Sequence, residues 1–142
     1  MNAILETDRA DILARRNHLG WDYWTTKDHR IGKGSPFSTL DAAMLLLETG
    51  MEPSDPILEE TARLILSTLR EDGRFRQAPS GGIYPCQTIH ALQVLCHLGH
   101  GDDPGLDRSF RHLLEIQWED GGWRCNKFSY GRGPETDHSN PG

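Results

Sequence analysis

Two pairs of segments in this chain resemble each other at a fixed spacing, and this internal repeat constrains the fold more than any other feature. The first pair, at an offset of 48 residues, consists of LEETARLILSTLREDGRF from Leu58 and LDRSFRHLLEIQWEDGGW from Leu106. The second pair, at an offset of 49 residues, consists of PFSTLDAAMLLLETG from Pro36 and PCQTIHALQVLCHLG from Pro85. A period of about 20–50 residues is typical of stacked supersecondary units, each of which buries its apolar face against a neighbour. The sequence therefore predicts a repeat fold.

Each repeat carries a short turn after its first helical segment. The turn reads DGRF from Asp72 and DGGW from Asp120, and DHRI from Asp28 is a degenerate first copy. The alignment predicts that Phe75 and Trp123, which end two of these turns, occupy equivalent places packed on a neighbouring repeat. One domain over residues 1–142 is expected, with repeats at about 9–56, 57–104 and 105–142.

The pattern within each repeat indicates helices rather than strands. Apolar residues such as Ala62, Ile65 and Leu69 recur at helical spacing, and no segment alternates convincingly with a period of two. The sequence therefore predicts an all-α structure with two helices per repeat. The expected helices lie near residues 9–25, 36–49, 57–70, 85–98 and 105–118.

Proline and glycine mark the ends of the second helix in each repeat. Pro36 and Pro85 suit the first turn of a helix, where the missing N–H has no partner to lose. Ser35 precedes Pro36 as a candidate N-cap. Gly50 and Gly99 each follow an apolar stripe, at the position where a left-handed residue ends a helix.

The end of the printed sequence is expected to leave a repeat incomplete. Pro141 stands where the second helix of a third repeat would begin, and only Gly142 follows it. We therefore expect about two and a half repeats, with Leu113, Leu114 and Ile116 not all covered within the chain. An apolar surface of this kind tends to recruit a neighbour, so self-association is also expected.

Charge and composition narrow the possible partners. The net charge of −6, from 15 Lys and Arg against 21 Asp and Glu, argues against nucleic acid as the main partner, since no dense basic stripe is present. The longest apolar run, residues 42–47, is far shorter than the about 20 residues that a membrane span needs. Three cysteines without a CxxC spacing and a charged N-terminal segment favour a cytoplasmic setting.

The third turn carries a more specific phrase. QWEDGGW, at residues 117–123, resembles the Q-x-x-D-G-x-W repeat signature of squalene-hopene cyclase, oxidosqualene cyclase and the β-subunits of protein prenyltransferases. The resemblance covers nearly the whole chain, from about Asp11 to Gly142. It implies an α/α-toroid, in which inner and outer helices surround a central apolar cavity that takes isoprenoid chains. It also implies that the signature is structural rather than catalytic, with its Gln and Trp linking neighbouring outer helices.

The acid motif of the cyclases has no clear counterpart here. Those enzymes protonate an alkene or epoxide with D-x-D-D, and the nearest segment is GDDPGLD, which holds Asp102, Asp103 and Asp107. This segment is a Gly/Pro turn, where a solvated, helix-initiating pair of aspartates is expected. No catalytic residue is assigned, and two functions stay open. One is a protein that binds or transforms an isoprenoid, and the other is a non-catalytic helical-repeat scaffold for a protein or lipid partner.

Two cations follow the third turn. Arg124 and Lys127 lie in RCNK, which is similar to a phrase in farnesyltransferase-type β-subunits whose Arg and Lys help to hold the prenyl diphosphate. The resemblance thus implies that both residues bind substrate, and a solvated basic loop is the alternative. The Asp-x-Cys that should follow to bind zinc in that family is missing.

A further candidate set lies on the second helices of the first two repeats. Cys86 and His90 are four residues apart and share a helix face, and Asp41 is the repeat equivalent of His90. Cys86 and His90 are candidate substrate-binding residues, and all three together have the chemistry of a zinc site. A small buried Cys and a partly solvated His are the alternative reading. We expect no bound cofactor, and zinc at these three residues is the alternative.

Overall fold

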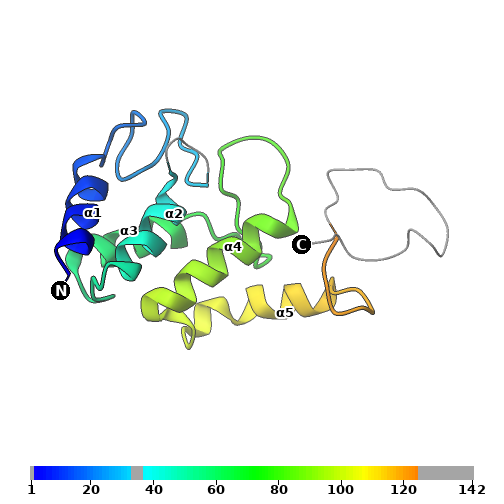
Figure 1. Ribbon diagram of the computed structural model, residues 1–142. Coiled ribbons are helices and arrows are strands. Elements are labelled where there is room, and N and C mark those ends of the chain that lie inside the picture. Colours follow the sequence, from blue (N-terminus) through cyan, green and yellow to red (C-terminus); the bar gives the residue numbers. More distant parts are fainter. Residues whose placement is uncertain (1, 33–36, 125–142) are drawn as a thin grey trace.

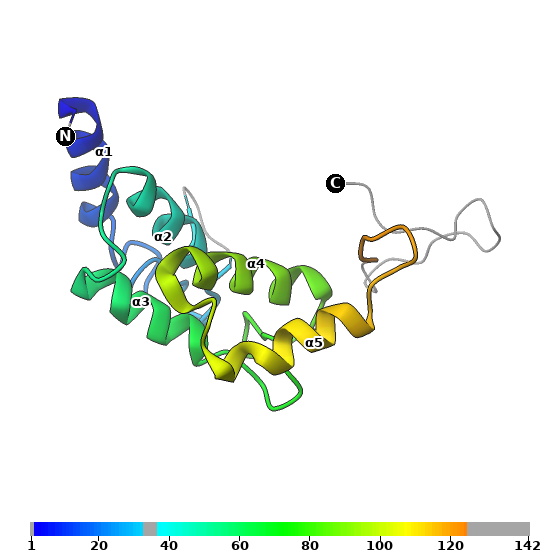
Figure 2. The same ribbon diagram turned by 90° about the horizontal axis from the view of Figure 1, so that it is seen from below.

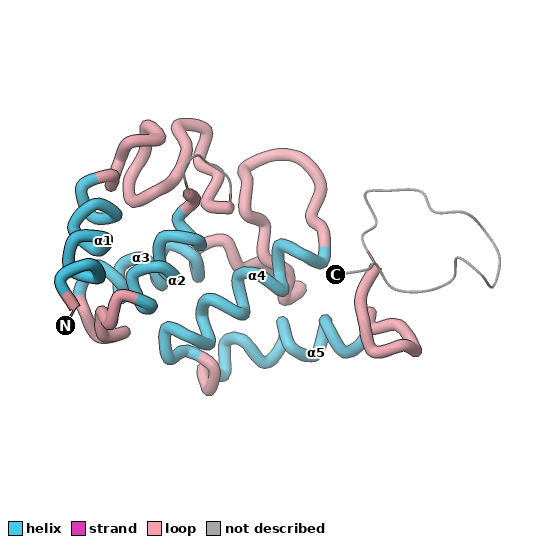
Figure 3. The backbone as a smooth tube through the Cα atoms, in the orientation of Figure 1, coloured by secondary structure: helices cyan, strands magenta, loops and turns pink. Residues whose placement is uncertain are grey.

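The computed structural model describes residues 2–32 and 37–124, and within them the chain is built from helices and turns (Figures 1 and 3). Isolated β-bridges join Gly20 to Thr26 and Leu69 to Phe75, but no strand forms among these residues. The prediction of an all-α structure is therefore confirmed for this part of the chain. The α-helices are α1 (Ala3–Ala14), α2 (Thr39–Glu48), α3 (Pro56–Leu66), α4 (Pro85–Leu95) and α5 (Asp107–Glu115), and shorter helical turns cover Cys96–His100 and Pro104–Leu106.

The helices pack in two layers. Helix α2 contacts α1, α3 and α4, and α4 in turn contacts α2, α3 and α5. Figure 2 shows α2 and α4 side by side. In this view α3 and α5 lie below them, and α1 lies at the left end. The second helices of successive repeats thus form one layer, and the first helices of the later repeats form the other.

The core lies between these layers. Leu40 and Leu46 of α2 are fully buried, as is Ile65 of α3. Trp24, from the loop after α1, is also fully buried, and its indole N–H donates to the carbonyl oxygen of Ile12 at 3.0 Å. This bond satisfies the one polar atom of a large apolar side chain, so that the loop after α1 is anchored to the core.

The first helix differs most from its prediction. It was expected over residues 9–25, but α1 ends at Ala14. Asn17 and Tyr23 beyond it have positive φ values of 71° and 57°, which a helix does not accommodate. The loop bends here because Trp24 must reach the core. Tertiary packing thus overrides the helical pattern of this segment.

The start of α2 also differs from its prediction. Ser35 and Pro36 lie outside the described residues, and the helix begins at Thr39 with Ser38 as its N-cap. The Ser38 hydroxyl accepts from the backbone N–H of Asp41 at 3.2 Å, and the Asp41 carboxylate accepts from the backbone N–H of Ser38 at 3.2 Å. This reciprocal capping box satisfies two amides that the first turn of a helix leaves without partners.

The other helix ends follow the sequence signals more closely. Helix α4 begins at Pro85, as predicted, and Gly50 and Gly99 take positive φ values of 89° and 92°. Helices α3 and α5 are shorter than expected, ending at Leu66 and Glu115, because the chain turns away before the Asp-Gly positions.

The same turn follows the first helical segment in all three repeats. In each turn the backbone N–H of the first residue donates to the carbonyl oxygen of the fifth. The backbone N–H of the fourth residue donates in return to the carbonyl oxygen of the first. The forward bonds are Thr26 to Arg30 (3.2 Å), Arg70 to Arg74 (2.8 Å) and Trp118 to Gly122 (2.8 Å); the returning bonds are His29 to Thr26 (2.9 Å), Gly73 to Arg70 (3.0 Å) and Gly121 to Trp118 (2.9 Å). The degenerate DHRI copy is thus a true structural equivalent of the two Asp-Gly turns.

Candidate functional site

The predicted residue Cys86 lines a pocket of about 390 Å³. Its thiol is exposed at the start of α4. One wall of the pocket is formed by Arg30 and Gly32 at the end of the first turn. The other wall is the loop that leads into α4, and Tyr84 of this loop lines the pocket. Two successive repeats therefore supply its walls.

Two glutamines hold the wall of this pocket in place. The backbone N–H of Gln77 donates to the side-chain oxygen of Gln87 at 3.0 Å, and the side-chain N–H of Gln77 donates to the carbonyl oxygen of Gln87 at 2.8 Å. The first repeat joins them, since the N–H of Ile31 donates to the carbonyl oxygen of Gln77 at 3.1 Å. A Cβ at Gly32 would lie 2.1 Å from Oε1 of Gln77, so a larger residue there would displace the Gln77 side chain that bonds to Gln87.

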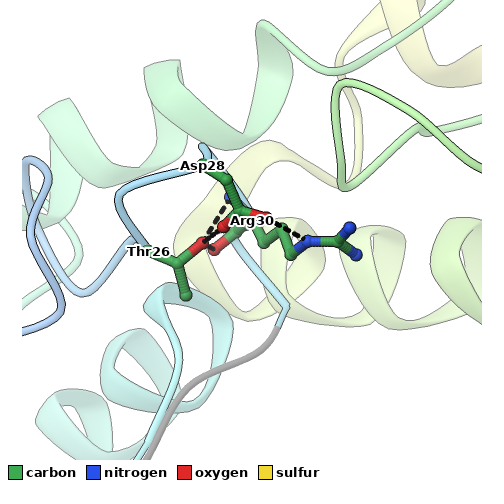
Figure 4. Close-up of polar contacts among 3 residues, drawn as sticks. All are labelled: Thr26, Asp28 and Arg30. Carbon is green, nitrogen blue, oxygen red and sulfur yellow. Dashed lines mark hydrogen bonds and ion pairs between the residues drawn. The ribbon is translucent and has the colours of Figure 1, made fainter.

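Arg30 is held by its own turn. Its Nε donates to Oδ2 of Asp28 at 2.6 Å, and the hydroxyl of Thr26 donates to Oδ1 of Asp28 at 2.6 Å (Figure 4). These two hydrogen bonds, of which the one from Thr26 has the larger effect, lower the pKa of the Asp28 carboxyl below its ordinary value. The charged carboxylate therefore sets the direction in which the guanidinium leaves the turn.

His90 and Asp41 do not join Cys86 in one cluster. His90 is half-buried one helical turn beyond Cys86, and it is not among the residues that line the pocket. The Asp41 carboxylate caps α2, where it accepts from the hydroxyl of Ser38 at 2.9 Å. Within residues 2–32 and 37–124, no three His, Cys, Asp or Glu side chains are arranged to hold a metal ion. The set Asp41, Cys86 and His90 thus has the right chemistry but not the arrangement.

Arg124 lies beside the third turn, and Lys127 lies outside the described residues. The Cζ of Arg124 is 5.1 Å from the centroid of the Trp118 ring, which is a cation–π distance. The side-chain N–H of Gln117 donates to the carbonyl oxygen of Gly121 at 2.7 Å. The signature glutamine thus braces the turn of its own repeat.

The two turn-ending aromatic residues differ in burial. Phe75 is fully buried, whereas Trp123 is half-buried and donates its indole N–H to the carbonyl oxygen of Leu113 at 2.8 Å. Trp118 is also half-buried. The equivalence of the turns holds, while the packing around their last residues differs between repeats.

The aspartates between α4 and α5 start a helical turn. The Asp103 carboxylate accepts from the backbone N–H of Gly105 at 2.8 Å, and Asp102 is exposed. Asp107 is exposed in the first turn of α5. These groups are solvated, as expected, whereas an acid that protonates an alkene needs a desolvated carboxyl with a raised pKa.

Arg30 and Tyr84, which line the pocket, were not predicted as site residues from the sequence. The only available signal was that DHRI aligns with the DGRF turn, which places Arg30 at the position of Arg74. Sequence spacing does not tell which arginine faces a neighbouring loop, because that depends on contacts between residues about fifty positions apart. A second, more open hollow of about 450 Å³ lies beside Leu69 and Asp72.

Comparisons with known protein families and with curated proteins found no match to this chain. In the part of the chain that the structure describes, none of the helices combines the length and the apolar character that crossing a bilayer requires.

Proposed function

We propose that this chain forms part of an α/α-toroid that binds an isoprenoid or a similar apolar chain. The observation that carries the proposal is the recurrence of one hydrogen-bonded turn, which lies in the loop after α1 and again shortly after α3 and α5, together with the Q-x-x-D-G-x-W phrase in the third. The side-by-side packing of α2 and α4 in one layer supports assigning them as inner helices.

The exposure of α4 also supports a continuing inner layer. Met44 and Leu47 of α2 are half-buried, whereas their repeat equivalents, Gln93 of α4 and Cys96 directly after it, are exposed. In a toroid each inner helix has an inner helix on both sides, so this face of α4 is where the next one would pack.

In this proposal Arg124 and Lys127 contact a charged head group at the edge of the cavity, and Cys86 and His90 lie on the neighbouring inner helix. An arginine and a lysine suit a diphosphate because both supply charged donors.

Calorimetric titration with farnesyl diphosphate, farnesol and pyrophosphate tests this function. We expect the first two to bind through the apolar chain, with the diphosphate form binding more tightly. Arg124→Gln combined with Lys127→Gln should weaken farnesyl diphosphate about tenfold or more, because charged hydrogen bonds are lost, and should leave farnesol binding unchanged. Arg111→Gln, at an exposed position on α5, is the matched control. Absence of binding by both farnesyl compounds would contradict the proposal.

The solvated turn at Asp102 and Asp103 favours a second candidate, a non-catalytic helical-repeat scaffold that binds a protein or lipid partner. A scaffold that only binds should release no pyrophosphate from farnesyl diphosphate. Steady release of pyrophosphate during incubation would favour an enzyme instead.

A further inference from the structure

The pocket beside the first turn has the size of a small-molecule site. Its volume of about 390 Å³ falls within the range of about 300–1,000 Å³ that is usual for ligand pockets. Its walls are fixed by the hydrogen bonds of Gln77 and Gln87 rather than by solvated side chains alone. Because the cavity is preformed, the free-energy cost of ordering the protein when a ligand binds is small.

The described residues that line this pocket carry positive charge and no negative charge. Arg30 contributes a guanidinium, and neither Asp nor Glu is among the described residues that line the pocket. Asp28 engages the Nε of Arg30, and Figure 4 shows the terminal nitrogens of the guanidinium extending away from Asp28 and Thr26. The forked edge that suits a carboxylate or a phosphate is thus directed away from the turn.

The remaining polar side chains of the pocket also favour an acceptor-rich ligand. Ser80 and Tyr84 each bring a hydroxyl group that can donate to a ligand, whereas Gln77 and Gln87 each use a side-chain N–H to hold the wall, donating to the carbonyl oxygens of Gln87 and Gly82. The ring of Tyr84 packs against the backbone of Gly82, where an added Cβ would lie 2.6 Å from the hydroxyl oxygen. An apolar or aromatic group of the ligand has this ring to contact.

We infer that this pocket binds a small organic oxyanion, a carboxylate or a phosphate monoester attached to an apolar or aromatic group, with Arg30 as its counter-charge. The inference is argued from Arg30, Gln87 and Tyr84, and not from Arg124 or Lys127 of the proposed isoprenoid site, although Cys86 lines this pocket as well.

Three probes of similar size separate the contributions: phenyl phosphate, benzoate and benzyl alcohol. Amide shifts in nuclear magnetic resonance titrations of the full chain locate binding. We expect phenyl phosphate to shift the amides of Gly81 and Gly82 but not those of Asp72 and Gly73 in the second turn. Benzyl alcohol should bind at least about tenfold more weakly, because it cannot pair with the guanidinium. Preference for phenyl phosphate or for benzoate identifies the head group.

The internal repeat offers a matched control variant. Arg74 pairs with Asp72 of its own turn, through Nε and Nη2, as Arg30 pairs with Asp28 through Nε, but Arg74 does not line the pocket. Arg30→Gln should weaken phenyl phosphate about tenfold or more, and Arg74→Gln should leave it unchanged. Equal binding of all three probes, shifts that bypass Gly81 and Gly82, or equal losses in the two variants would overturn the inference. The amide shifts of the unsubstituted chain decide the matter even if Arg30→Gln fails to fold.

Discussion

At the scale of single residues, His29 takes the place that glycine holds in the other two turns. Its φ is 62°, compared with 88° for Gly73 and 85° for Gly121. A left-handed conformation costs a residue with a Cβ about 1–2 kcal/mol. The His29 ring lies on Trp21, with ring centroids 4.0 Å apart, and this contact offsets part of the cost. The first turn therefore keeps its shape although its Gly is absent.

Tyr23 is the residue whose ionisation reports most directly on the fold. Burial, aided by its hydrogen bond to the Glu60 carboxylate at 2.6 Å, raises the pKa of Tyr23 from 10.0 to about 12. Because the folded pKa is the higher one, the resulting stability is fully present below pH 10 and is lost as pH rises towards about 12. We expect Glu60→Gln to bring this pKa down, as measured by tyrosinate absorbance.

Tyr23→Phe serves as the assignment control, since it should remove the high-pH component of the titration. A component for Tyr23 near its ordinary pKa of 10.0 in the unsubstituted chain would show that the contact with Glu60 is not maintained in solution.

At the scale of elements, Gly73 couples the second turn to α5. An added Cβ there would lie 2.6 Å from the carbonyl oxygen of Arg108, whereas a Cβ at Gly99 meets nothing within 4 Å. The two glycines share positive φ values of 88° and 92°, so Ala costs both the same backbone strain of about 1–2 kcal/mol. Gly73→Ala should lower the free energy of unfolding by at least about 1 kcal/mol more than Gly99→Ala does, because the backbone must shift to relieve the overlap.

Urea denaturation of both alanine variants measures this difference in the free energy of unfolding. Gly99→Ala is the control for strain alone. If the two midpoints fall equally, α5 does not pack against the second turn as closely as the structure places it.

At the scale of the whole molecule, burial is concentrated in the layer that α2 and α4 form. Five residues of α2 and five of α4 are buried, whereas α1 and α5 each bury one, Ile12 and Ser109. Local opening costs more where more buried contacts are lost. Hydrogen exchange followed by mass spectrometry should therefore be slowest in α2 and α4 and fastest in α1 and α5.

The same measurement tests self-association, which stays a prediction. Leu114 on α5 is 69% exposed, and Leu113 and Ile116 are half-buried. Protection of α5 that rises with protein concentration, without a matching rise in α1, is the expected result. Exchange in α5 that is as slow as in α2 at low concentration would contradict the layered arrangement of burial.

Much of the fold was predictable, and less of the candidate site. The helical period, the three turns and the start of α4 at Pro85 agree with the sequence patterns. The extent of α1 does not, and the zinc-like set around Asp41 is not assembled. Lys127 lies outside the described residues, and substrate binding by Arg124, Cys86 and His90 stays a prediction.

Signals confined to a few neighbouring residues were enough to specify the turns and most helix positions. A glycine with positive φ such as Gly73, or a proline in the first turn of a helix such as Pro85, acts within one helical turn, so its effect can be predicted from neighbouring residues. The pocket between Arg30 and Tyr84 was decided only in three dimensions. It depends on the hydrogen bond from Ile31 to Gln77 and on the close contact of Gly32 with the Gln77 side chain. These contacts join segments more than forty residues apart, and no local sequence pattern specifies them.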